Sequence, residues 1–176
     1  FGQLKDGSNG DEGMKYLSKL TVDNEGGNVD FTNNKIIVRD ADKLTLIFSS
    51  STNYKNENYL AFVDSLMNDA KSHSYKYLKR KHIESYQELF NRVELDLGEG
   101  ITDNHSIDDR LYAFQEEDDP QLAALYFHYG RYLFISSTRE DLLPPNLQGL
   151  WANTIQTPWN GDYHLNINVQ MNHWLA

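Results

Sequence analysis

The chain is best understood from residues 143–174, which read LPPNLQGLWANTIQTPWNGDYHLNINVQMNHW. This stretch contains all three tryptophans, Trp151, Trp159 and Trp174, among many asparagines and glutamines. Indole rings bury large apolar areas, whereas amide groups cost free energy when they are buried without hydrogen-bond partners. The mixture therefore favours a ligand that offers both apolar faces and many hydroxyls, as a sugar does.

The run HLNIN, residues 164–168, lies at the centre of this stretch. An extended conformation would direct His164, Asn166 and Asn168 to one face and the two aliphatic residues between them to the other. Asn168 would then cap a helix that begins at Val169. The residues alone leave a second interpretation open, in which the two asparagines serve only a turn and a cap.

Between residues 119 and 174 the motifs GRYLFISS, LPPNLQGLW, PW followed by DYHLNIN, and QMNHW occur in this order. The ordered set resembles the start of the catalytic domain of glycoside hydrolase family 95, a family of α-L-fucosidases with some α-L-galactosidases. The likeness is strongest after Asp119, looser upstream, and weak before Tyr16. It implies a mixed fold: part of an antiparallel β-sandwich (residues 1–53), an α-helical linker (residues 54–118) and the first helices of an (α/α)6 barrel (residues 119–176).

The resemblance also implies roles for individual residues. Asn166 and Asn168 match a pair of asparagines that orient the attacking water with help from a distant Asp. His164 matches a sugar-contacting position, and a histidine there resembles the fucose-cutting members more than the galactose-cutting ones. Trp151 and Trp159 are the candidate sugar platforms of the stretch, although either indole could instead pin its loop to the barrel.

Inverting hydrolysis also needs an acid that protonates the leaving oxygen. In the family this acid is a Glu from a later part of the barrel, and the nearby carboxylates Glu140, Asp141 and Asp162 are expected to be solvated or capping groups. We therefore expect a fragment of an inverting enzyme that removes terminal α-L-fucose from glycans, inactive by itself. An α-L-galactosidase and a non-catalytic carbohydrate-binding or structural fragment remain as alternatives.

The amino-acid composition excludes several classes of binding partner. Sixteen Lys and Arg against 26 Asp and Glu give a net charge of −10, which disfavours nucleic acid and anionic membrane surfaces. There is no apolar run of membrane-spanning length, no Cys, no Gly-rich phosphate loop and no cluster of metal ligands, so neither a cofactor nor a metal is predicted. A secreted or periplasmic location follows only from the resemblance, and nothing indicates the oligomeric state.

Upstream, the pattern changes from strands to helices. Short β runs bounded by Gly and Asn predict antiparallel strands over residues 16–22, 29–32, 36–39 and 44–49. Apolar spacing predicts helices over residues 60–70 and 75–93, with residues 107–117 a loosely structured connection. Asp119 and Pro120 mark the start of a third helix. Within it, Gly130 indicates a close approach, and Arg131 is expected to form an ion pair or, alternatively, to bind sugar.

Overall fold

The computed structural model describes residues 1–4, 13–100, 105–140 and 142–175. The chain forms two compact units, Phe1–His82 and Ile83–Ala176. The first contains antiparallel sheets, one complete helix and the start of a second, and the second unit is built from helices and a long loop, so the predicted mixed architecture is confirmed. No helix in the described ranges has the length and apolar character that a membrane span requires. The predicted domain limits at residues 53 and 118 stay predictions.

The strands of the first unit are β1 (Gly2–Gln3), β2 (Lys15–Glu25), β3 (Asn28–Thr32), β4 (Lys35–Arg39) and β5 (Lys43–Thr52). They correspond to the four predicted runs, with β1 in addition. β5 pairs with β2, and the β3–β4 hairpin is inserted between them in the chain. Asn33 and Asn34 close that hairpin with positive φ angles of 47° and 58°, as a two-residue hairpin turn requires.

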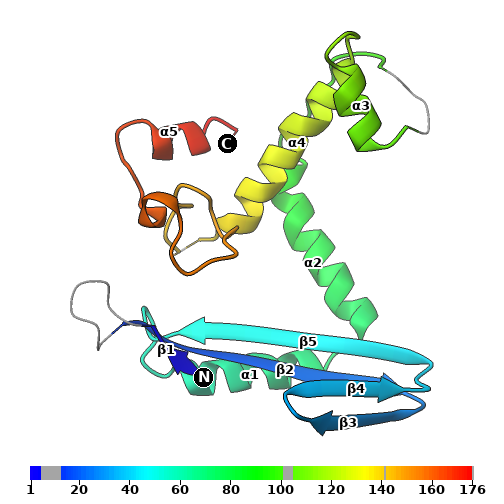
Figure 1. Ribbon diagram of the computed structural model, residues 1–176, viewed down its shortest axis with the longest axis vertical. Helices are drawn as coiled ribbons and strands as arrows, with labels where there is room; N and C mark the ends of the chain where they lie inside the picture. Colours follow the sequence, from blue (N-terminus) through cyan, green and yellow to red (C-terminus); the bar gives the residue numbers. More distant parts are fainter. Residues whose placement is uncertain (5–12, 101–104, 141, 176) are drawn as a thin grey trace. The chain divides into compact units, whose positions relative to one another are not determined.

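The ribbon doubles back where β2 leads into β3 (Figure 1). Gly26 and Gly27 have φ angles of 70° and 64°, and Asp40 on the returning arm has 54°. A Cβ atom at Gly27 would collide with the backbone of Arg39, so only glycine fits there. The two glycines therefore fix the reversal.

Helix α1 (Tyr59–Lys71) covers one face of the β2–β5 ladder (Figure 1). Val63 and Met67 are its buried residues, and Lys19 of β2 forms an ion pair with Asp64. Side chains alternate along a strand, so Leu20 and its cross-strand neighbour Phe48 lie on the opposite face, where both are exposed.

The second unit takes its shape from α2 (Tyr75–Phe90), whose last turns lie in it, α3 (Ile107–Ala113) and α4 (Pro120–Ser137). The start of α4 is as predicted: the Asp119 carboxylate accepts from the backbone N–H of Leu122 at 3.0 Å, and Pro120 opens the helix. Asp119 is 1% exposed and accepts two further hydrogen bonds from Arg110, at 2.8 and 3.0 Å.

Residues 107–117, predicted to be a loose connection, instead begin with helix α3. The Ser106 hydroxyl oxygen accepts from the backbone N–H of Asp109 at 3.2 Å, and the hydroxyl donates to the Asp109 carboxylate at 2.7 Å. This reciprocal arrangement is a helix start signal at Ser and Asp three residues apart. The sequence contains the signal, but the helix is too short for its apolar spacing to be recognised.

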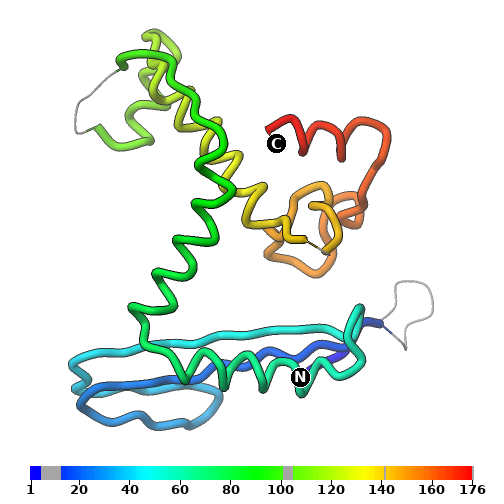
Figure 2. The backbone as a smooth tube through the Cα atoms, turned by 180° about the vertical axis from the view of Figure 1, so that it is seen from behind, coloured from blue at the N-terminus to red at the C-terminus, as the bar shows by residue number. Residues whose placement is uncertain are grey.

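Helix α4 packs against the end of α2, as both backbone views show (Figure 2). Arg131 is 4% exposed and donates to the carbonyl oxygens of Phe90 and Val93 at 2.9 and 3.1 Å, and to that of Leu89 at 3.4 Å. It therefore binds the end of α2 in place of the predicted ion pair or sugar. The close approach predicted at Gly130 is confirmed, since a Cβ atom there would lie 2.8 Å from the Leu175 side chain.

Candidate carbohydrate site

The candidate site is built on the segment that follows α4, residues 143–167, which we call the 143–167 loop. Its backbone has little regular secondary structure beyond the short helix η1 (Pro158–Gly161). The Asn146 side chain accepts from the backbone N–H of Gln148 at 3.2 Å, and the backbone N–H of Leu147 donates to the carbonyl of Asp162 at 3.3 Å. The beginning and the end of the loop are therefore joined to each other.

Helix η1 carries Trp159 in an unusual conformation. Trp159, Asn160 and Gly161 have φ angles of 49°, 57° and 61°, a left-handed region that costs energy for residues with a Cβ atom. Gly161 is buried, and a Cβ atom there would lie 3.0 Å from the Thr157 hydroxyl and 3.1 Å from the Asn146 side chain. Three consecutive residues bend the chain here, and the Trp159 indole is left 74% exposed.

Residues 165–167 form a turn, so the extended interpretation of residues 164–168 is wrong and the turn that the sequence left open is present. His164 and Ile167 have φ angles of 32° and 87°, and a positive φ angle breaks the alternation that an extended run requires. The next helix, α5 (Asn168–Asn172), begins at Asn168 itself, with Ile167 in the N-cap position. Asn168 is therefore the first residue of α5 and not its cap.

The side chain of Gln170 replaces the expected cap. Its Oε1 atom accepts from the backbone N–H of Ile167 at 2.9 Å, and its Nε2 atom donates to the carbonyl oxygen of Leu165 at 2.6 Å. A glutamine at the third helical position that reaches back to the N-cap amide is one half of a capping box. The amide thus holds both sides of the turn.

Helix α5 is attached to its surroundings by side chains. The Asn172 amide donates to the carbonyl of Asn146 at 2.8 Å, and the His173 ring meets Phe134 of α4 edge-on with 4.9 Å between ring centres. Leu175 fills the space above Gly130. The end of α5 is therefore fixed to both α4 and the 143–167 loop.

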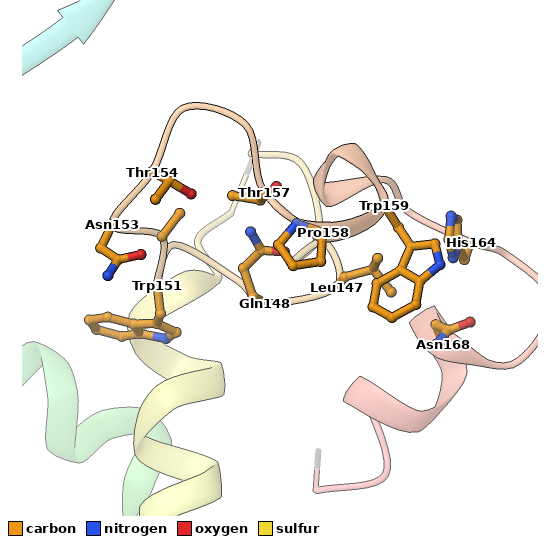
Figure 3. A pocket seen from close by; sticks show the side chains of 11 residues that line it. Leu147, Gln148, Trp151, Asn153, Thr154, Thr157, Pro158, Trp159, His164 and Asn168 are labelled. Atoms are coloured by element: carbon orange, nitrogen blue, oxygen red, sulfur yellow. The ribbon is translucent and has the colours of Figure 1, made fainter.

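These elements enclose a pocket of about 620 Å³ (Figure 3). Four predicted site residues line it: Trp151, Trp159, His164 and Asn168. Trp159, His164 and Asn168 lie toward one end of the lining, and Trp151 lies with Asn153 and Thr154 toward the other (Figure 3). The remaining lining residues are Leu147, Gln148, Ala152, Thr157 and Pro158. The turn brings His164 and Asn168 to the same hollow by a path different from the predicted one.

The fifth predicted residue, Asn166, is exposed in the turn and does not line the pocket. Conversely, Gln148, Asn153, Thr154 and Thr157 line it without having been predicted. All four belong to the amide- and hydroxyl-rich stretch, but an irregular backbone has no period from which their direction could be deduced. The composition therefore indicates the segment that holds the pocket, and the irregular backbone conformation determines which of its residues line it.

The residues that line the pocket include no Asp, Glu, Lys or Arg. Beside His164 lies the carboxylate of Asp162, whose Oδ2 atom is 3.9 Å from Nε2 of His164, with more than half of its side chain exposed. Glu140 is exposed and lines a different hollow, and Asp141 lies outside the described residues. Exposed indole faces, amides and hydroxyls in such a pocket suit a neutral ligand rich in hydroxyls.

Comparison with known proteins identifies the class of protein to which this chain is similar. The sequence pattern of the glycosyl hydrolase family 95 catalytic domain matches residues 74–176. The chain is 39% identical to "Probable alpha-fucosidase A" of Aspergillus niger, over 92% of this chain and 23% of that protein. It is 37% identical to "Alpha-L-fucosidase 2" of Arabidopsis thaliana, over 93% of this chain and 21% of that protein. A second "Probable alpha-fucosidase A", from Aspergillus oryzae, is 36% identical over 85% of this chain and 23% of that protein.

The match covers more than half of the chain, including α4, the 143–167 loop and the pocket. The chain therefore belongs to glycosyl hydrolase family 95, which confirms the resemblance inferred from the motifs. It spans less than a quarter of the length of the curated relatives.

Proposed function

We propose that this chain is part of an inverting α-L-fucosidase that removes terminal α-L-fucose from glycans. The supporting observation is the convergence of Trp159, His164 and Asn168 on one uncharged pocket within the segment that matches the catalytic domain. The relatives named as fucosidases support the choice of sugar. Hydrolysis then consumes one water, breaks the bond between the anomeric carbon and the bridging oxygen, and releases fucose and an alcohol.

Sugar recognition is assigned to the aromatic and imidazole side chains. The exposed Trp159 indole offers an apolar surface to the C–H face of the sugar ring, and His164 beside it offers ring nitrogens to a hydroxyl. Trp151 is 49% exposed and lies farther along the same lining (Figure 3), so it is assigned to the substrate as well. A wall of this kind binds a neutral sugar without needing a charged partner.

Water orientation is assigned to Asn168 together with Asn166. A side-chain carbonyl accepts a hydrogen bond from water and directs a water lone pair toward the anomeric carbon, although an amide is too weak a base to remove the proton alone. The resemblance supplies the distant Asp that assists and the Glu that protonates the leaving oxygen, neither of which is assigned to this chain. We therefore expect the 176-residue chain alone to be inactive.

The proposed architecture of the parent protein follows the family. The strands of the first unit would belong to a β-sandwich, and the exposed apolar face with Leu20 and Phe48 supports a covering layer there. Helices α1 and α2 would form the linker, and α4 and α5 would begin an (α/α)6 barrel. We propose a secreted or periplasmic location on the same family basis.

The test uses the full-length protein that contains this chain. Its incubation with an α-L-fucoside should release L-fucose, and proton NMR at early times should show the β-anomer first, because inversion at an α-linked carbon gives β-fucose. Parallel reactions with α-L-galactosides distinguish the two sugars. Saturable binding of fucose without any release of it from fucosides would replace this proposal by a carbohydrate-binding function.

A further inference from the structure

We propose that Gln170 is a positioning residue that sets His164 and Asn168 in register with each other, an inference that rests on the proposed function. Both residues line the pocket, and they flank the turn that the Gln170 amide bridges. Gln170 itself is exposed and does not line the pocket. Its influence on the reaction therefore passes through the two residues that do.

The turn needs an external brace because its backbone conformation is unfavourable. Ile167 has a φ angle of 87°, and a β-branched residue with a positive φ angle is a genuine outlier. Such conformations persist where the surroundings fix them and tend to occur at ligand-binding sites. The two bonds from Gln170, to Ile167 and Leu165, lie directly on the strained segment.

The Gln170 bridge joins the two sides of the site. On one side, Leu165 directly follows the sugar-contact candidate His164, and on the other, Ile167 directly precedes the water-orienting candidate Asn168. A second contact, 3.4 Å between the backbone N–H of Val169 and the carbonyl of His164, closes the same turn at the limit of hydrogen-bond length. Loss of the bridge should therefore change the separation between sugar contact and water contact.

The chemistry of the bridge is specific to an amide. One atom must accept from an N–H and the other must donate to a carbonyl. A carboxylate of the same shape accepts but does not donate, whereas a protonated carboxylic acid does both. Gln170→Glu should therefore regain the bridge only as the pH falls toward the ordinary glutamate pKa of about 4.3.

The experiment compares the full-length protein with its Gln170→Met, Gln170→Glu and Gln87→Met variants, of which the last changes an exposed glutamine on α2. We expect Gln170→Met to lower kcat roughly 10- to 100-fold, because a displacement of about 1 Å in an active site has effects of that order. The KM and the unfolding midpoint should change little, and Gln87→Met should match the wild type. For Gln170→Glu, the rate relative to wild type at the same pH should rise as the pH is lowered.

Wild-type kcat in Gln170→Met, or a Gln170→Glu rate ratio that is independent of pH, would overturn the inference. If the wild-type protein releases no fucose, the proposed function fails and the inference is decided by crystal structures of the wild type and Gln170→Met. A change of about 1 Å or more in the separation of the His164 ring and the Asn168 amide supports it. Superimposable turns refute it.

Discussion

Helix α4 and the 143–167 loop that follows it are stabilised by opposite means. In α4 the backbone satisfies itself, and two buried charged side chains attach the helix to its neighbours: Asp119 binds Arg110, and Arg131 binds the end of α2. In the loop, few backbone groups pair regularly, and side-chain amides bind the backbone of a segment whose positive φ angles are unfavourable by themselves. Buried side chains and two charged contacts position the helix, whereas the loop depends on many small side-chain contacts.

The comparison also divides the amides of residues 143–174 into two groups. Asn146, Gln170 and Asn172 bind the backbone of their own segment, while Gln148, Asn153 and Asn168 line the pocket. The composition of the stretch favoured a ligand but did not separate these two uses, and a turn-and-cap role stayed open for Asn166 and Asn168. Part of the amide-rich composition is therefore structural, and the sequence pattern does not distinguish the two uses.

The largest effect, on kcat, should come from Asn168, the first residue of α5 directly after the loop. Replacing Asn168 by Gly or Asp in the full-length protein should lower kcat for an α-L-fucoside by about 100- to 10,000-fold, the range of a positioned proton-transfer or water-orienting group. Initial rates of fucose release measure it. Asn91→Gly, at an exposed position directly after α2, should leave the rate unchanged. Full activity in the Asn168 variants would remove this residue from the mechanism and leave the pocket with a binding role.

The next largest effect should come from the helix side, at Arg131. Arg131→Met keeps the apolar stem but removes the guanidinium that donates to three carbonyl oxygens, two of which also accept from a backbone N–H. The free energy of unfolding should therefore fall by about 2–4 kcal/mol. Urea unfolding of the chain measures it. The matched control is Arg92→Met, since the side chain of the exposed Arg92 donates to the carbonyl of Glu88 at the surface and its loss should cost less than about 0.5 kcal/mol. Equal losses in both variants would show that burial of the guanidinium is unimportant.

A smaller loss of stability should follow from Gly161→Ala in the loop. The left-handed backbone costs about 1–2 kcal/mol for a residue with a Cβ atom, and the new methyl group also meets Thr157 and Asn146. Gly98→Ala is the control, because Gly98 has a φ angle of 92° but a Cβ atom there would meet no described atom within 4 Å. Thermal unfolding should show the larger loss for Gly161. If Gly98→Ala lowers the stability by as much as Gly161→Ala, backbone strain alone accounts for the loss and the contacts with Thr157 and Asn146 do not contribute.

The smallest effect is a pH dependence at the start of α3. Hydrogen bonds from the Ser106 hydroxyl and backbone hold the pKa of Asp109 below its ordinary value of 3.8. A carboxyl group whose pKa is lower in the folded state stabilises the fold above the unfolded pKa, and this contribution disappears as the pH falls through the folded pKa. Asp109→Asn should therefore flatten the acid limb of stability against pH below about pH 4. An unchanged acid limb would exclude this contribution.

Prediction from the sequence succeeded where local chemistry determines local structure. Asp119 and Pro120 mark the start of α4 because an acidic cap and a proline each have one favourable place there. The strands followed from short β runs between Gly and Asn. For residues 164–168 the sequence left an extended run and a turn open. It could not decide for the turn, because positive φ angles at His164 and Ile167 contradict intrinsic preference, and their support comes from Gln170, which alternation does not reveal. Asn166 is exposed in this turn and does not line the pocket, and its role in the site stays a prediction.

The strand ribbon that doubles back at Gly26 and Gly27 has a consequence for how the chain folds. The Asn33–Asn34 turn closes only a very short loop, and each later pairing, from Thr32 with Lys35 to Tyr16 with Thr52, extends a ladder already begun. Each new pairing therefore closes only a small additional loop and costs little loop-closure entropy. We expect pairing to nucleate at this turn and to zip outward, with α1 docking last. The first unit should then reach its native register quickly even though its outermost partners are far apart in sequence.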